Sequence, residues 1–167
     1  MCLHLLVLLP FLFLSQVSHP QQSRNTKRQV PKTCAVTTTD AHRFEPPWPY
    51  QANGGVRWFG SDRLWTVLPA DGKWGRGVKT FWFRQEWGFY ARDQWIPEED
   101  AEKLTVTTRR LDGPAPPPEI LKADSAYREE DWKAFLVGGI NFSTEGCWEV
   151  SARYEDDELT FVVWVSL

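Results

Sequence analysis

Three runs of carboxylates, at 98–100, 129–131 and 155–158, are the first residues in this sequence that could carry chemistry. Carboxylate oxygens in loops can bind Ca²⁺, but they must converge on one point, usually around a turn that contains glycine. No run has the spacing of an EF-hand loop, and the cysteines and histidines follow no metal-ligand spacing. We therefore interpret the runs as solvated turns and predict no metal site.

Nucleophilic catalysis has no recognisable motif in the chain. Neither GxSxG nor HExxH occurs, and His42 stands beside Arg43 without a nucleophile nearby in the sequence. We predict no catalytic residue and no cofactor. A glycosidase needs only two suitably placed carboxylates, and no sequence pattern fixes their positions, so a carbohydrate-active protein stays open as the alternative.

Ten tryptophans form the other chemically capable group. Aromatic faces stack on sugar rings and attract cations, so tryptophans in exposed loops could form a glycan-binding surface. The candidates lie near Gly, Arg and Lys in turn-rich sequence, and they are Trp58, Trp74, Trp87 and Trp95. The competing interpretation is that a small domain fills its core with tryptophan, as we expect for the tryptophans within strand patterns, Trp65 and Trp148.

The N-terminus has the organisation of an export signal. Residues 3–14 form an apolar run that is too short to span a bilayer, and small residues follow it up to Ser18. We predict a signal peptide over residues 1–18 and no transmembrane anchor after its cleavage; a buried core helix is the competing interpretation. Residues 19–33 are polar and basic, which predicts a disordered linker. The protein is therefore expected to be secreted or periplasmic.

Signal cleavage changes the cysteine count. Of three cysteines, Cys2 leaves with the signal, and Cys34 and Cys147 remain. An isolated pair in an oxidising compartment predicts a disulfide bond. A catalytic thiol is the weaker interpretation, because neither cysteine lies in a local motif and His42 is the only histidine from Cys34 onward.

The charge of the chain is divided unevenly. The net charge is −3, but four basic residues and no acidic ones precede Cys34, so that the chain from Cys34 onward carries 15 basic and 22 acidic residues. An acidic domain repels phosphate backbones, so we predict that nucleic acid is not a partner.

Alternating apolar and polar residues predict an all-β domain. In 147–154, for example, Trp148, Val150, Ala152 and Tyr154 share one face, whereas Cys147 lies on the opposite face. A polar turn at 155–157 then predicts a hairpin with 159–165. The predicted strands are 34–39, 63–68, 78–83, 103–110, 136–142, 147–154 and 159–165. Residues 89–90 are expected to begin a further strand, a bulge is expected at 138–139, and helix is limited to short turns around 97–103 and 125–132.

Three segments resemble motifs of an uncharacterised family of bacterial exported proteins: LWTVLPADG (64–72), LTVTTRRLDGPAPPP (104–118) and GCWEVSARYEDDELTFVV (146–163). The resemblance covers most of the chain from Cys34 onward. The family is similar to immunoglobulin-like domains, so the resemblance implies an all-β, immunoglobulin-like antiparallel β-sandwich with long loops over residues 34–167. It also implies pairing of Cys34 with Cys147, and it implies no activity.

These observations predict a binding or structural module of the cell exterior. Its partner would be an unknown protein or glycan. The alternative is a carbohydrate-binding or carbohydrate-active protein that uses exposed tryptophans and loop carboxylates.

The export signal generates the first testable prediction. When the full chain is expressed in an exporting host, we expect the exported protein to begin at His19, because Ser18 ends the run of small residues after the apolar segment. N-terminal sequencing or intact-mass measurement of the exported protein checks this. Recovery of exported protein that still carries residues 1–18 would contradict it.

Overall fold

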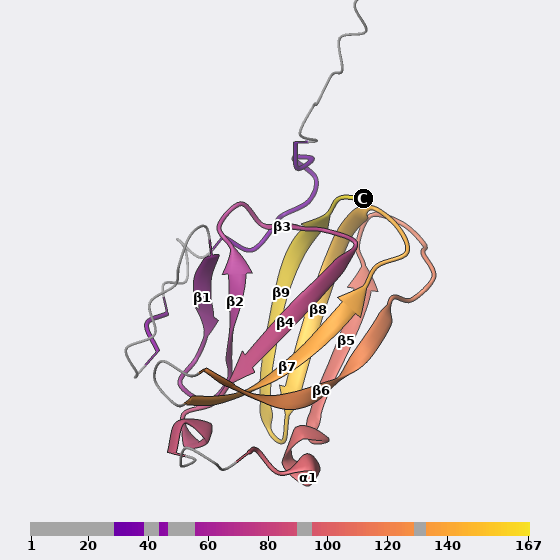
Figure 1. Cartoon of the computed structure of the whole chain (residues 1–167). Helices are drawn as coiled ribbons and strands as arrows, with labels where there is room; N and C mark the ends of the chain where they lie inside the picture. Colours follow the sequence, from indigo (N-terminus) through magenta and orange to yellow (C-terminus); the bar gives the residue numbers. More distant parts are fainter. Residues whose placement is uncertain (1–28, 39–43, 47–55, 90–94, 129–132) are drawn as a thin grey trace, which may run out of the picture.

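The computed structural model describes residues 29–38, 44–46, 56–89, 95–128 and 133–167. Within these ranges the chain forms two β-sheets, mainly antiparallel, that pack face to face as a curled sandwich, with one short α-helix at the lower end (Figure 1). The predicted signal peptide and most of the predicted linker lie outside the described residues, and so do His42 and the run 129–131. In the described part, no helix has both the length and the apolar composition needed to cross a bilayer.

The first sheet has five strands in the order β1-β2-β4-β7-β6, and all neighbours in it are antiparallel. Its strands are β1 (Val56–Gly60), β2 (Trp65–Pro69), β4 (Gly77–Phe83), β6 (Glu119–Arg128) and β7 (Lys133–Asn141). The second sheet has the order β3-β9-β8-β5, in which the short β3 runs parallel to β9 and the other pairs are antiparallel. Its strands are β3 (Lys73–Trp74), β5 (Leu104–Arg110), β8 (Gly146–Tyr154) and β9 (Asp157–Val165). A 3₁₀ helix, η1 (Glu86–Phe89), and the helix α1 (Glu98–Ala101) complete the described elements.

The β8–β9 hairpin supplies one wall of the main core. Trp148 and Val150 of β8 and Phe161 and Val163 of β9 are each at most 2 % exposed and belong to one hydrophobic cluster. They pack in that cluster with inward-facing residues of the first sheet, such as the fully buried Trp82. The faces predicted from the two-residue period are thereby confirmed for this hairpin.

A second aromatic layer covers the outer face of the first sheet. Trp65 and Phe83 stack with ring centroids 6.1 Å apart, and Phe135 lies 5.3 Å from Phe83. Phe44 packs against Trp65 from a segment outside the strands, with a centroid distance of 5.7 Å. The prediction that Trp65 is a core residue is confirmed, since only 2 % of it is exposed, but it lies in this outer cluster.

Three predicted elements are wrong in type. Residues 34–38 form no strand. Instead, Thr37 docks on β9: its N–H donates to the Val162 carbonyl, and its hydroxyl accepts the Val162 N–H, both at 2.8 Å. The threonine side chain thus replaces the backbone acceptor that a strand would have offered. Residues 125–128, where a helical turn was expected, end β6, and Phe89 ends the helix η1 rather than beginning a strand.

Two strands, the five-residue β1 and the ten-residue β6, were not predicted from the sequence pattern. Glycines surround β1 in the sequence, which resembles a loop. In β6 the pairing register shifts between Leu121 and Asp124, a bulge that breaks the alternation of side chains. A bulge was expected at Gly138–Gly139 in β7. The irregularity does lie opposite these glycines, but β6 carries the one extra residue and β7 is regular.

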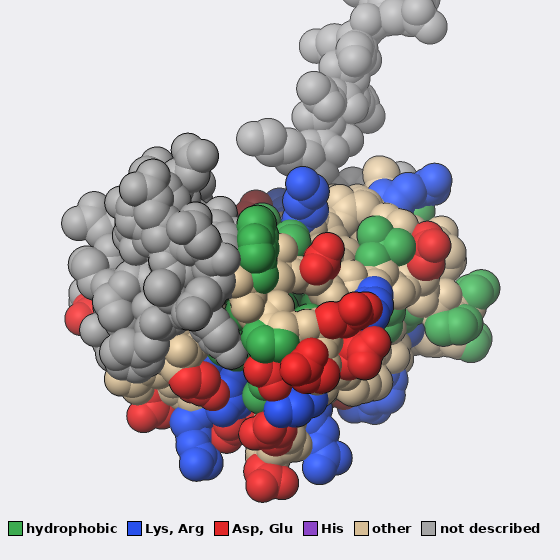
Figure 2. Space-filling view, turned by 60° about the horizontal axis from the view of Figure 1, so that its bottom comes forward, with side chains coloured by type: hydrophobic (Ala, Val, Ile, Leu, Met, Phe, Trp, Pro, Cys, Tyr) green, Lys and Arg blue, Asp and Glu red, His purple; other side chains and the backbone are tan. Residues whose placement is uncertain are grey.

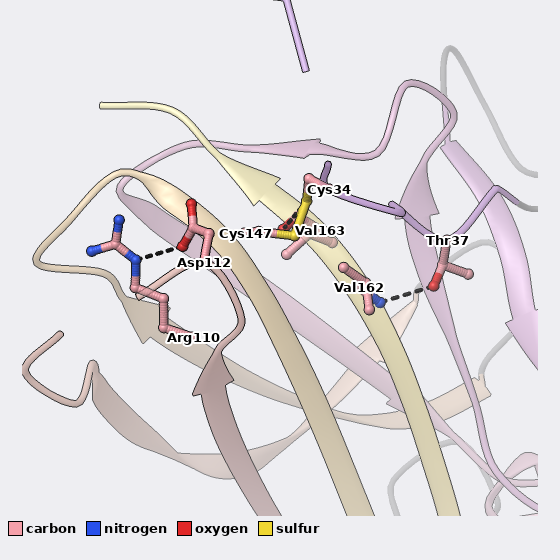
Figure 3. Close-up of a disulfide and its surroundings, with 7 residues drawn as sticks. All are labelled: Cys34, Thr37, Arg110, Asp112, Cys147, Val162 and Val163. Carbon is pink, nitrogen blue, oxygen red and sulfur yellow. Dashed lines mark hydrogen bonds and ion pairs between the residues drawn. A yellow bond between two sulfur atoms is a disulfide. The ribbon is translucent and has the colours of Figure 1, made fainter. Parts of the chain in front are cut away.

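The predicted disulfide between Cys34 and Cys147 is present, with a Cα–Cα distance of 5.5 Å (Figure 3). It lies on the outer face of β8 and β9, where both cysteines cluster with Trp164. The bridge therefore fastens the N-terminal segment to the outside of the second sheet and does not join the two sheets through the core. This agrees with the prediction that Cys147 faces away from Trp148.

An ion pair lies close to the disulfide. Arg110 Nε and Asp112 Oδ1 are 2.7 Å apart, on the turn that follows β5 (Figure 3). Burial alone would raise the pKa of Asp112. Hydrogen bonds from the Arg110 side chain and from the backbone N–H of Cys147 outweigh that effect and lower the pKa.

The opposite end of the sandwich is tied by Arg84, which follows β4. Its guanidinium lies 2.7 Å from Asp157 at the start of β9 and 4.4 Å from the ring centre of Tyr154 in β8, and it also pairs with Glu86. Burial of Arg84 opposes its charge, but the two carboxylates raise its pKa overall. Arg84 thus connects the first sheet to the second through side chains of both signs and an aromatic face.

The disulfide can be tested by removing it. We expect the double variant Cys34→Ser/Cys147→Ser to lose up to about 5 kcal/mol of unfolding free energy, because the bridge closes a loop with a sequence separation of 113 residues. Urea unfolding measures the loss, and reduced wild type is the matched control. Two free thiols in denatured, unreduced exported protein would contradict the bridge.

A second prediction concerns the turn between β1 and β2. Gly60 has φ +138°, and a Cβ there would lie 2.4 Å from the carbonyl oxygen of Leu64, whereas Gly113 has φ +150° and no atom within 4 Å. Alanine at either position would have an unfavourable positive φ, but only the methyl group of Gly60→Ala would also collide with another part of the backbone, the Leu64 carbonyl. We expect Gly60→Ala to cost about 1–3 kcal/mol more unfolding free energy than Gly113→Ala in urea titrations. Equal losses would show that the close approach is relieved without cost.

Candidate functional site

The structure separates the four candidate tryptophans. Trp74 is 6 % exposed and Trp87 is 1 % exposed, so their rings belong to the core. Trp58 is half-buried, with its ring edge-to-face against Phe83 at 5.4 Å. Trp95 alone among these four is well exposed, with 58 % of its surface open to solvent.

Core packing explains the two buried tryptophans. The Trp74 ring meets Phe161 edge-to-face at 5.5 Å and lies 6.2 Å from Phe142. Trp87, in η1, packs edge-to-face on Tyr154 at 5.3 Å and closes the lower end of the core. The core interpretation therefore holds for Trp74 and Trp87, and the ligand-contact interpretation is left with Trp95 and the accessible part of Trp58.

Trp95 borders a groove between α1 and β6. We call it the Trp95 groove; its volume is about 730 Å³, and it is lined by Trp95, Ile96, Glu98, Ala101, Lys122, Ala123, Asp124 and Ser125. The segment before α1 is fixed to β6, because the Ile96 N–H donates to Ser125 Oγ at 2.8 Å. Ile96 is buried while Trp95 points outward, so this backbone hydrogen bond helps to hold the indole at the rim of the groove.

Lys122 connects the two walls of the Trp95 groove. Its ammonium lies 3.0 Å from Glu98 Oε1 and 3.0 Å from Glu102 Oε1. Hydrogen bonds to Glu102 and Glu98 raise the pKa of Lys122. All three side chains are more than half exposed, so the pairs add little to stability, and they remain accessible to a ligand.

A smaller cavity opens beside the groove, between the edge strands of the two sheets. We call it the seam cavity; its volume is about 240 Å³, and it shares Ala101, Lys122 and Ala123 with the groove. Its walls are Leu104 and Val106 of β5 and Ile120 and Leu121 of β6, with Gly138 and Trp82 at its inner side. In Figure 2, which brings this end of the molecule forward, Asp and Glu side chains gather beside hydrophobic ones.

The sequence analysis predicted only some of the residues that line this site. It singled out Trp95 and the carboxylates of α1, but not Lys122, Asp124 or Ser125. These three residues lie in or next to the β6 bulge, where the register shift places consecutive side chains along the groove. The sequence offers only a weak signal for them, the adjacent aliphatic residues Ile120 and Leu121 after the proline-rich segment, because alternation is absent in 119–125.

The carboxylates of the runs 98–100 and 155–158 form ion pairs with different basic residues. Asp100 and Glu155 both pair with Lys103, at 2.7 and 3.2 Å, and these hydrogen bonds raise the pKa of the lysine. Asp157 pairs with Arg84 and Arg63. In the described part of the chain, no three residues among His, Cys, Asp and Glu are grouped so that they could hold a metal ion. The run 129–131 lies outside the described residues.

Comparisons of the chain with protein-family models, with curated proteins and with solved structures give no match. The geometry of the Trp95 groove therefore has to support a functional argument by itself.

Proposed function

We propose that this protein is an exported binding module whose ligand contact is the Trp95 groove. The observation that carries the proposal is the exposure of Trp95, a 58 % exposed indole at the rim of a groove in a domain that buries most of its other described tryptophans. Covering an exposed indole face with an apolar ligand surface is favourable, and the rim of the groove places this face where a ligand in the groove can contact it.

Export is supported by two observations from different parts of the chain. The apolar run 3–14 has the length and position of a signal peptide. The Cys34–Cys147 disulfide is typical of proteins that mature in an oxidising compartment. We propose a secreted or periplasmic location on these grounds.

The immunoglobulin-like class of sandwich is also part of the proposal. Two antiparallel sheets with a filled core support it, as does the resemblance of the segments at 64–72, 104–118 and 146–163. The outward position of the disulfide differs from the antibody pattern, in which the bridge crosses between the sheets. An immunoglobulin-like domain in this chain would therefore use the bridge to anchor its N-terminal segment.

A carbohydrate ligand is the specific candidate that the groove favours. An indole face stacks on the apolar face of a pyranose ring, while Asp124, Glu98 and Lys122 offer hydrogen-bonding groups around the same space. Hydrolysis of the sugar is less well supported than binding. Glu98 and Glu102 direct one oxygen each to the Lys122 ammonium, an arrangement suited to holding polar ligands rather than to a pair of carboxylates on either side of a glycosidic bond.

Replacement of Trp95 tests the function. We expect a glycan array, extended to soluble cell-wall polysaccharides, to show binding by the wild-type domain. We further expect Trp95→Ala to weaken that binding by about tenfold, the loss of roughly 1.4 kcal/mol of stacking. Titration calorimetry with the best glycan from the array gives the dissociation constants.

Leu167→Ala provides the matched control. Leu167 is 55 % exposed, similar to Trp95, but it is the C-terminal residue, at the end of the sandwich opposite α1 (Figure 1). The control variant should bind as the wild type does. The absence of any glycan that binds the wild type would reject carbohydrate as the ligand class, and equal weakening by the two variants would reject the groove as the site.

A further inference from the structure

We propose that the seam between β5 and β6 binds an extended peptide segment of a partner protein, which adds as a strand to the free edge of β5. The segment would carry alternating apolar side chains, one of which enters the seam cavity, and a basic residue toward α1. This inference goes beyond the function proposed for the Trp95 groove, because it concerns a different cavity and a different class of ligand.

The first support is the edge of β5 itself. β5 ends the second sheet and pairs over all seven of its residues with β8, without a bulge. Beyond the strand, the Leu111 N–H donates to the Cys147 carbonyl at 2.8 Å, which fixes the phase of the ladder. In an antiparallel pair every second residue is hydrogen-bonded to the residue opposite it, so the bonded positions of β5 have the same parity as Leu111. Val106 and Thr108 lie at the alternate positions, and their N–H and C=O groups therefore point away from β8.

Those groups form a row that a strand can use. Among the described residues, no backbone hydrogen bond reaches the outer edge of β5. A regular edge of this kind, with three threonines among its seven residues, is a template for an added strand. Natural sheets usually protect such an edge with a bulge, a proline or charged side chains, and 104–110 contains no proline and no bulge, while its two charges, Arg109 and Arg110, are confined to its last two positions.

The seam cavity provides the second support. Gly138 lies opposite the inward-facing Thr80 in β7–β4 pairing, so no side chain fills the space in front of it. Ala123 is the neighbouring small residue on β6. A Cβ added to Gly138 would lie 3.2 Å from Thr80 Oγ1, 3.4 Å from the Leu121 carbonyl oxygen and 3.7 Å from the Ala123 Cα, so a side chain at this position would crowd the inner wall of the seam cavity.

Exposed apolar residues extend the cavity to the surface. Ile120 is 38 % exposed and Leu121 is 48 % exposed, although they are consecutive residues of one strand. Ile120 pairs with Ile140 and Leu121 with Gly139, so the two side chains lie on opposite faces at the edge of the first sheet. Both residues also line the seam cavity, so apolar surface continues from the cavity to its rim, where an apolar side chain of an added segment would cover it.

Charge decides between possible occupants. The residues that line the groove and the seam cavity include three carboxylates, Glu98, Glu102 and Asp124, and one cation, Lys122. Arg109 and Arg110 at the other end of β5 are already paired, with Glu149 and Asp112. The α1 end of the seam is therefore acidic, and it favours a segment whose end at α1 is basic.

The test uses synthetic peptides as probes of the folded domain. One library holds ten-residue peptides in which Thr alternates with Val, Ile, Leu or Phe between terminal lysines. The second library has glutamates at the ends, and the third has proline in place of alternate threonines. We expect selection of lysine-ended peptides, with at least tenfold weaker binding of their glutamate-ended versions, and hydrogen-exchange protection of the Val106 and Thr108 amides in the complex.

Two variants separate the edge from the cavity. Thr108→Pro removes an outward N–H but leaves the β8 pairing intact, and Thr108→Ala is its control because it keeps the N–H. Gly138→Ala narrows the cavity, and Gly77→Ala in β4 is its control, since a Cβ there meets a single close atom, Asn141 Oδ1 at 3.1 Å. Each test variant should weaken peptide binding about tenfold, while both controls bind as the wild type does. Urea unfolding of all four variants confirms that they are folded.

Several outcomes would overturn the proposal. Equal selection from the proline library would exclude strand addition, and unchanged affinity in both Thr108→Pro and Gly138→Ala would exclude the seam. A monomer–dimer equilibrium that Thr108→Pro abolishes would assign the edge to a second copy of this chain.

The same variants distinguish this proposal from the one for the Trp95 groove. Trp95→Ala should leave peptide affinity nearly unchanged and Gly138→Ala should leave glycan affinity unchanged, so failure of either proposal is recognised separately.

Discussion

The packing of the inward rows of β8 and β9 against β4 and β7 is the interaction on which the rest of this structure depends. Val150, Phe161 and Val163 from one sheet and Trp82 and Leu136 from the other are at most 1 % exposed. Each such side chain contributes about 1.5–3 kcal/mol when it leaves water, which exceeds the roughly 0–1 kcal/mol typical of a surface ion pair. Successive side chains of a strand point to opposite faces, so the residues between these core residues must lie on the outer face of their sheet.

The position of the disulfide follows from that constraint. Because Trp148 points into the core, Cys147 must point out, and its partner must approach over the outer face of the second sheet. Cys34 does so with the help of Thr37, which bonds both backbone groups of Val162. The bridge therefore stabilises the folded state by holding the N-terminal segment and by shortening the unfolded chain, while the union of the two sheets relies on the core and on Arg84.

Sequence patterns predicted the elements whose two faces differ most clearly. The β8–β9 hairpin, β5 and the core of β4 were placed nearly to the residue, because alternation is strong where one face is buried and the other is solvated. β6 was missed because its bulge destroys the alternation, and 34–38 was taken for a strand because threonine and valine are common in strands. The candidate site lies along β6, so the same bulge that hid the strand also hid Lys122 and Asp124.

Tryptophan burial could not be predicted from neighbouring residues, and this limited the prediction of the site. Trp74 and Trp95 both stand among turn-forming and charged residues, yet one is 6 % and the other 58 % exposed. The difference arises from tertiary position: β3 places Trp74 beside Phe161, whereas Trp95 precedes α1 at the rim of the sandwich. The composition of a segment predicts that it forms a turn, but it does not predict whether the side chains of that turn face the core or the solvent.

The open side of the sandwich has a compositional origin. Small residues line the seam, with Ala101, Ala123 and Gly138 around the cavity, whereas aromatic rings such as those of Phe59, Trp82 and Phe161 fill the core between the sheets. Larger side chains at the exposed rim would bury more apolar area, although Gly138 itself has little room for one. The chain instead leaves a cavity there, with Ile120 and Leu121 in water beside it. The exposed parts of these aliphatic groups add little to the stability of the isolated fold, and they would add more if a partner covered them, which is the condition that the proposed peptide meets.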